Sequence, residues 1–157
     1  MKEQLSIDHL REQLDDIHRR YPAFKQDDLF VCWFLRAYLT EDEKVVVDAV
    51  TGGPGDKSVD AVLIDHKAKG VFLVQGKYRQ KLLGKTERRG DVMDFANLAK
   101  PFADSEPGPF GALCKNMHSH AARLLSDARP FVVEKGYRLW TYYVTLGSIS
   151  GAFRDEV

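Results

Sequence analysis

The stretch VDAVLIDHKAKGVFLVQGKY, residues 59–78, contains two apolar runs separated by the polar segment HKAKG. Each run has the length of a short strand and is rich in Val, and the segment between them is typical of a turn. The stretch therefore predicts an antiparallel hairpin folded about residues 66–69. Because side chains alternate along a strand, Gln75 and Lys77 are expected on one face, with Asp60 across from them on the neighbouring strand. The three side chains should meet at one end of a sheet.

These three side chains suggest a specific chemistry. The carboxylate of Asp60, the amide oxygen of Gln75 and the carbonyl of Gly76 are hard oxygen ligands suited to Mg²⁺. The amine of Lys77 can orient or deprotonate water, or stabilise a developing negative charge. Because Mg²⁺ held by one carboxylate usually keeps positions for water and substrate phosphate, the pattern predicts phosphodiester chemistry.

The segment TGGPGDKSVD, residues 51–60, resembles a phosphate-binding loop at first sight. Such a loop needs the spacing G-x-x-x-x-G-K-[ST] and a helix directly after it. Here Asp56 separates the last glycine from Lys57, which puts a carboxylate where phosphate would lie, and the chain continues as a predicted strand. The segment is therefore interpreted as a β turn that leads into Asp60.

Helical patterns lie on both sides of the hairpin. Apolar residues at helical spacing predict a first helix, and an apolar run after Asp27 and Asp28 predicts a buried central helix with acids at its amino end. The later helical pattern is interrupted by a loop at residues 105–111 and near Pro130. The expected elements are helices at 7–21, 29–39, 91–102 and 113–134 and strands at 44–50, 59–65, 70–78 and 137–147. This order predicts an α/β fold in which helices pack against a mixed sheet.

Length and composition favour one globular domain over residues 1–157, with 44% hydrophobic residues. The 23 basic and 23 acidic side chains cancel, so a nucleic acid or an anionic membrane would have to be held by a local patch. No apolar run approaches the roughly 18 to 20 residues needed to span a bilayer, and the amino-terminal segment is charged, so a cytoplasmic protein is expected. Cys32 and Cys114 are interpreted as free thiols.

The sequence GDKSVDAVLIDHKAKGVFLVQGKYR, residues 55–79, resembles the core motif of the PD-(D/E)XK nuclease superfamily, in the variant with Gln in place of the second acid. It is most similar to the amino-terminal region of the AIPR family, abortive-infection phage-resistance proteins, and more distantly to Mrr-type restriction endonucleases. The resemblance implies a restriction-endonuclease-like αβββαβ core, a mixed sheet flanked by helices with an extra N-terminal helix. Because AIPR proteins are generally longer, it leaves open that residues 1–157 belong to a longer chain with further domains.

The resemblance also implies roles for individual residues. Asp60 would be the principal metal ligand, Gln75 would fill the second ligand place, the carbonyl of Gly76 would complete the site, and Lys77 would be the catalytic lysine. A further acid is often found on the helix before the first strand, and Asp28 is the better placed of the two candidates. Because Gln is neutral, metal affinity should be lower than in the acidic form of the motif, and binding of two metals is less assured.

Basic residues follow the expected site closely along the chain. Next to a phosphodiester site they would form a track for phosphate groups that binds without reading sequence, and a tyrosine among them would pack against a sugar or base. The residues expected to contact nucleic acid are Tyr78, Arg79, Lys81, Lys85, Arg88 and Arg89. The alternative interpretation of the same run is a solvated loop.

These patterns together predict a metal-dependent DNA endonuclease that uses Mg²⁺ or Mn²⁺ and acts in phage defence or restriction. Two alternatives stay open. One is a catalytically inactive nuclease-fold module that binds DNA or a partner protein, and the other is an enzyme whose substrate is RNA or a nucleotide. Formation of a homodimer also stays open.

Overall fold

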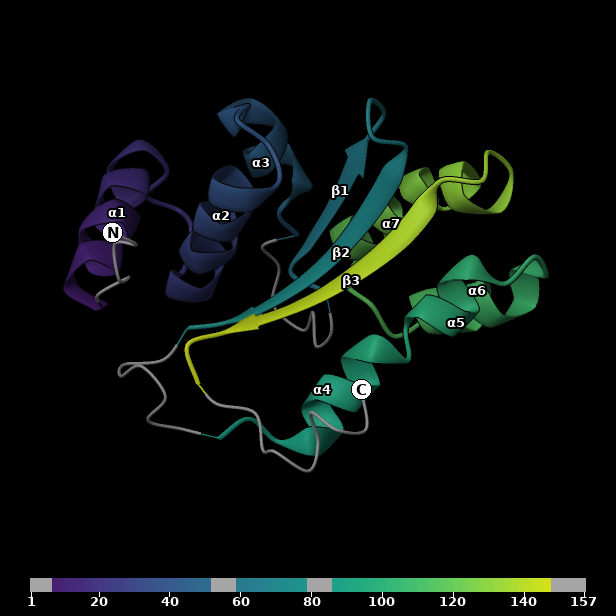
Figure 1. The fold of residues 1–157 in the computed structure, drawn as a ribbon. Helices are drawn as coiled ribbons and strands as arrows, with labels where there is room; N and C mark the ends of the chain where they lie inside the picture. Colours follow the sequence, from purple (N-terminus) through teal and green to yellow (C-terminus); the bar gives the residue numbers. More distant parts are fainter. Residues whose placement is uncertain (1–6, 52–58, 79–85, 148–157) are drawn as a thin grey trace, which may run out of the picture.

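The computed structural model describes residues 7–51, 59–78 and 86–147. Within these ranges the chain forms an α/β structure in which helices cover both faces of a three-stranded sheet (Figure 1). The helices that precede the sheet in sequence lie on one face, and the helices that follow the hairpin lie on the other. The predicted mixed α/β fold is therefore confirmed, although several elements differ from their expected form.

The predicted hairpin is present. Strand β1 (Ala61–Asp65) pairs antiparallel with strand β2 (Gly70–Lys77), and Ala61 lies opposite Val74. The turn between them is stabilised by the Asp65 carboxylate, whose Oδ1 accepts the amide N–H of Ala68 at 2.9 Å. The last predicted strand is also present as β3 (Arg138–Thr145).

Strand β2 is the central strand of the sheet, because β3 pairs with it in parallel on the side away from β1. The register places Gln75 beside Tyr143 and Lys77 beside Thr145. Since β2 is covered on both faces, it reads as a nearly continuous apolar run up to Gln75, where polar residues begin.

The first helical layer consists of α1 (Ile7–Arg20), α2 (Gln26–Tyr38) and α3 (Glu43–Ala49). These helices pack on the sheet face that carries Ala61 and Val74. The predicted stripe of the first helix is confirmed, since residues three and four apart along α1 enter the core. The buried helical residues of this layer include Leu10, Leu14, Ile17, Leu29, Phe30, Val31, Cys32, Leu35 and Val46.

The prediction of a strand at residues 44–50 is wrong, because most of this segment forms α3. Asp42 caps the helix, and its Oδ1 accepts the amide N–H of Lys44 at 3.0 Å. Val46 and Ala49 lie three residues apart and are both buried, which is a helical spacing. The strand propensity of a run of valines is therefore overridden by the N-cap of Asp42 and by packing against the sheet.

The second helical layer covers the opposite face and is more divided than the sequence predicts. The helix predicted at 91–102 is split in two, and a further helix begins at Pro107, within the segment 105–111 that the sequence predicts as a loop. Pro107 at the first helical position explains this start, because proline lacks an N–H that would be unpaired there. The elements are α4 (Arg89–Ala96), α5 (Ala99–Ala103), α6 (Pro107–Cys114) and α7 (Ser119–Val133). Pro130 lies within the last turn of α7, which continues past it to Val133.

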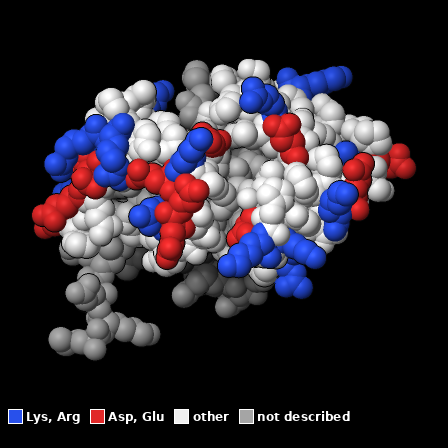
Figure 2. Space-filling model, turned by 90° about the horizontal axis from the view of Figure 1, so that it is seen from above, with Lys and Arg blue, Asp and Glu red and all other residues white. Residues whose placement is uncertain are grey.

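The surface carries both signs of charge. Lys and Arg side chains alternate with Asp and Glu over the face seen in Figure 2, which agrees with the equal numbers of basic and acidic residues. In the part of the chain that the structure describes, none of the helices has the length and apolar character required to cross a membrane.

Gly76 provides a test of the packing between α2 and β2. A Cβ at this position would lie 2.5 Å from Val31 Cγ2 and 3.4 Å from Phe30 Cδ2, so Gly76→Ala requires the Val31 side chain or the backbone beside it to shift. We expect the free energy of unfolding to fall by about 1–3 kcal/mol in urea denaturation, as for other overpacked sites. Gly111→Ala on α6 is the control, because nothing lies within 4 Å of a Cβ there. Equal stabilities of the two variants would contradict the close approach.

Candidate functional site

Asp60 is held at the open end of the hairpin by contacts on its backbone and side chain. Its carboxylate Oδ2 accepts the amide N–H of Gly76 at 2.8 Å, and its own N–H donates to the carbonyl of Val74 at 2.8 Å. On the other side, the amide N–H of Thr51 donates to the Asp60 carbonyl at 2.8 Å. Asp60 is thus fixed with its carboxylate against the end of β2.

Gln75 and Lys77 flank the peptide that binds the Asp60 carboxylate. They project from the same face of β2, because they lie two residues apart in a regular strand. Gln75 is only 4% exposed, whereas Lys77 is half-buried. The structure therefore brings the Asp60 carboxylate to the backbone between Gln75 and Lys77.

Asp27 is the second acid at this edge of β2. Its Oδ1 accepts the amide N–H of Tyr78 at 3.1 Å, one position further along the same edge than the amide of Gly76. A strand residue directs its N–H and C=O to the same side, so the Gly76 carbonyl faces the edge where Asp60 lies. The two amides that bind these carboxylates are two residues apart, about 6.6 Å along a strand. The Gly76 carbonyl lies between them.

Asp28 occupies a different position from its neighbour. Its Oδ2 accepts the amide N–H of Lys25 at 3.3 Å, a contact within the first turn of α2. An acid in this position satisfies a free N–H group and interacts favourably with the helix dipole. The Asp27 carboxylate is therefore bonded to the end of β2, and the Asp28 carboxylate is bonded at the start of α2.

Tyr78 is predicted to contact nucleic acid, whereas the structure places its ring in the core. The residue is 8% exposed and packs edge-on against Phe30, with ring centroids 5.9 Å apart. Its hydroxyl accepts a hydrogen bond from Arg11 Nε at 3.4 Å. Alternation along β2 directs Tyr78 to the same side as Gly76, under α2, and away from Gln75 and Lys77.

The predicted basic track is only partly described. Arg79, Lys81 and Lys85 lie outside the described residues. Arg88 and Arg89 are exposed at the amino end of α4, where Arg88 is the N-cap and Arg89 the first helical residue. Contact of these two arginines with phosphate therefore remains a prediction.

Glu87 is a site residue that the sequence pattern did not reveal. It is 6% exposed, and its carboxylate accepts hydrogen bonds from the hydroxyls of Tyr143 at 3.1 Å and Thr145 at 2.7 Å. These two residues lie beside Gln75 and Lys77 in the register of β2 and β3. The only signal in the sequence was one acid within a basic run, which is more typical of a solvated surface.

The oxygen donors at the end of β2 fit a hard divalent cation. Asp60 and Asp27 supply carboxylates, and Gly76 supplies a carbonyl. Among the residues described, no group of three or more His, Cys, Asp or Glu gathers as for a metal ion. A cation here would keep several positions for water or substrate, which is the usual behaviour of Mg²⁺.

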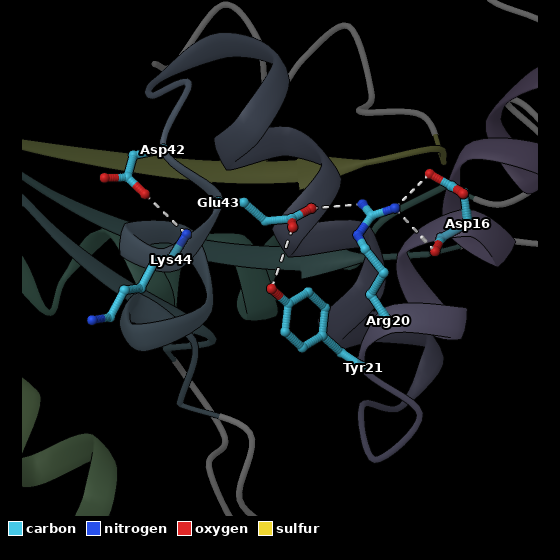
Figure 3. A network of polar contacts seen from close by, with 6 residues as sticks. All are labelled: Asp16, Arg20, Tyr21, Asp42, Glu43 and Lys44. Atoms are coloured by element: carbon cyan, nitrogen blue, oxygen red, sulfur yellow. Dashed lines mark hydrogen bonds and ion pairs between the residues drawn. The ribbon is translucent and has the colours of Figure 1, made fainter.

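A separate cavity of about 510 Å³ lies between α1, α2 and α3, and its lining includes none of the residues of the candidate site. Charged groups in its wall are bonded to one another (Figure 3). Arg20 donates to Glu43 Oε1 at 2.6 Å and to Asp16 Oδ2 at 2.7 Å, and these contacts raise the pKa of its guanidinium group. The Tyr21 hydroxyl donates to Glu43 Oε2 at 3.3 Å. This network connects α1 to α3.

Comparisons of the chain with protein-family models, with curated proteins and with solved structures found no match. The function is therefore inferred from the residues at the end of the sheet.

Cys32 in the wall of the cavity is a structural thiol. Burial raises its pKa to about 12, with the carboxylate of Asp28 as the next contribution. At pH 8 only about one molecule in 10⁴ carries the reactive thiolate at this position. We expect iodoacetamide at pH 8 to modify Cys32 much more slowly in the folded protein than in urea, as followed by mass spectrometry. Equal rates in the two states would show that the thiol is accessible.

Proposed function

We propose that this chain is a nuclease domain of the PD-(D/E)XK type, which hydrolyses phosphodiester bonds of DNA with Mg²⁺ or Mn²⁺. The observation that carries the proposal is the 2.8 Å hydrogen bond between the Asp60 carboxylate and the amide of Gly76. This contact joins the acid of one strand to the peptide that links Gln75 and Lys77 on the next. A carboxylate, an amide and an amine at the open end of a hairpin are the groups that the sequence resemblance implies.

The arrangement of strands supports a restriction-endonuclease-like core in part. An antiparallel hairpin is followed by helices and then by a strand parallel to the second strand of the hairpin, with helices on both faces. The position of the first core strand differs, because α3 occupies it. An isolated antiparallel bridge between Val50 and Ala61 extends pairing beyond β1 at this point.

The chemistry divides among the residues at the site. Asp60, Asp27 and the Gly76 carbonyl would hold the metal ion, and the amide oxygen of Gln75 would contribute beside them. When bound, the ion supplies Lewis-acid polarisation of a phosphate oxygen and a water molecule of lowered pKa. The Lys77 ammonium would stabilise the negative charge that develops as hydroxide attacks phosphorus and the bond to the leaving oxygen breaks.

A non-catalytic DNA-binding module is the second candidate, and Gln75 favours it. The residue is neutral where the acidic form of the motif has a charge, and it is almost fully buried. A site with weaker metal binding could retain the fold and the phosphate contacts of Arg88 and Arg89 without cleavage. In either case the proposed role is in defence against phage or in restriction, in the cytoplasm, where foreign DNA arrives.

Cleavage of plasmid DNA tests the enzymatic proposal. We expect the protein to nick a supercoiled plasmid with Mg²⁺ or Mn²⁺ and not with EDTA, and Lys77→Ala to reduce the rate roughly 10²- to 10⁴-fold. Asp60→Ala should reduce it at least as much, because a principal metal ligand is removed. Parallel assays with single-stranded DNA and RNA identify the substrate class. Equal nicking by all three proteins would rule out these residues, and salt-dependent DNA binding without cleavage would favour the module.

Asp27 and Asp28, neighbouring acids of α2, allow a matched pair of variants to be compared. We expect Asp27→Asn to lower metal-dependent cleavage by about tenfold or more, because its carboxylate lies at the end of β2. Asp28→Asn should leave the rate nearly unchanged and lower the free energy of unfolding by up to about 1 kcal/mol, because Asp28 acts at the start of the helix. Initial rates and urea denaturation measure the two effects. The reverse pattern would assign the site to Asp28.

A further inference from the structure

Glu87 places a buried carboxylate on the β3 side of the candidate site. Thr145, which binds one of its oxygens, is the register partner of Lys77, and Tyr143, which binds the other, is the register partner of Gln75. Partners on adjacent strands project from the same face, and their backbones are about 4.8 Å apart. The Glu87 carboxylate is thus bound by the two side chains immediately beside Gln75 and Lys77.

Burial of a carboxylate is costly unless it is compensated, and this one is oriented by two hydroxyl groups. Each hydroxyl donates a hydrogen bond to the carboxylate and brings no formal charge of its own. Glu87 lies two residues before Arg89, the first residue of α4, so its carboxylate is positioned where the second helical layer meets the end of the sheet. Phe95 of α4 packs against the ring of Tyr143, with centroids 6.1 Å apart, and helps to keep that hydroxyl in place.

The Glu87 carboxylate would change the balance of charge around a cation at this site. A divalent cation at the Gly76 carbonyl would have the carboxylates of Asp60 and Asp27 on one side, and the positive Lys77 beside it. Gln75 is neutral, so the strand itself provides no further negative charge. Glu87 lies across Gln75 and Lys77 from the two aspartates, and it would restore the missing charge from the β3 side of the site.

We propose that Glu87 supplies the negative charge that the Gln75 form of the motif lacks, and thereby raises the affinity of the site for a divalent cation. The inference depends on the proposed function, because it takes the end of β2 as a metal site. Glu87 acts in this proposal through its charge and through the hydroxyls of Tyr143 and Thr145. The competing explanation is structural: the same two hydrogen bonds would serve only to attach the chain before α4 to β3.

Exchange of the charge between positions 87 and 75 separates the two explanations. Isothermal titration calorimetry with MnCl₂ alone, without DNA, gives the dissociation constant for the parent, Glu87→Gln, Gln75→Glu and the double variant. We expect Glu87→Gln to weaken Mn²⁺ binding about 10- to 100-fold, as for other residues that surround metal ligands. The double variant should recover affinity to within a few-fold of the parent, because the charge returns on the adjacent strand. A purely structural role of Glu87 would not be rescued from position 75.

Two further variants complete the experiment. Glu134→Gln removes an exposed carboxylate at the end of α7 and should bind Mn²⁺ as the parent does. If Glu87→Gln does not fold, the triple variant Glu87→Met, Tyr143→Phe, Thr145→Val removes the charge together with both hydroxyls that the structure shows bound to it. The same loss of Mn²⁺ affinity is expected for this variant.

The outcomes distinguish the inference from the function on which it depends. Unchanged Mn²⁺ affinity in Glu87→Gln, with binding lost in Asp60→Ala, would overturn the role of Glu87 and leave the proposed metal site intact. Failure of the double variant to recover affinity would also overturn it. Absence of Mn²⁺ binding by the parent protein would overturn both the inference and the proposed function.

Discussion

The close approach of α2 to the central strand at Gly76 is the constraint on which the candidate site depends. Because Gly76 has no side chain, Val31 of α2 packs directly over the strand, at a position where a Cβ would lie 2.5 Å from its methyl group. The amide of Gly76 also donates a hydrogen bond to the Asp60 carboxylate. One backbone position therefore determines how near the first helical layer comes to the sheet and where Asp60, the residue before β1, is held. The amino end of α2, with Asp27, reaches the next outward-facing amide of β2 as a result.

The two faces of β2 have different roles at this end. On the α2 side, Gly76 and Tyr78 are buried in the core and anchor the helix. On the other side, Gln75 and Lys77 emerge beside the hydroxyls of β3, which hold Glu87. Acidic groups thus lie at the end of β2 on the β1 side (Asp60 and Asp27) and on the β3 side (Glu87), whereas the amine lies on β2 itself. A hard cation and a phosphate require this combination of negative and positive groups within a short distance.

The hairpin and its polar end could be predicted from the sequence because the pattern is local. Alternation and turn signals within residues 59–78 are sufficient to pair the strands and to place Gln75 and Lys77 on one face. The segment 44–50 could not be assigned in this way, because its valines suit a strand and their positions also suit a helix. Asp42 and the packing of Val46 decided between them. Tyr78 follows the polar residues Gln75 and Lys77, and its burial under α2 has no local signal in the sequence.

The sequence by itself determined the hairpin, the apolar run that ends at Gln75 and the place of Asp60 at the open end of the hairpin, because each depends on residues that are close along the chain. Only the tertiary structure decided which acid of α2 reaches the strand, that Tyr78 is buried, and that Glu87 joins Tyr143 and Thr145. These features depend on packing between segments that are 51 to 58 residues apart, as for Asp27 with Tyr78 and Glu87 with Thr145. Neither a parallel pairing to β3 nor the docking of α2 leaves a periodic signal in the sequence, so both become visible only when the elements are assembled.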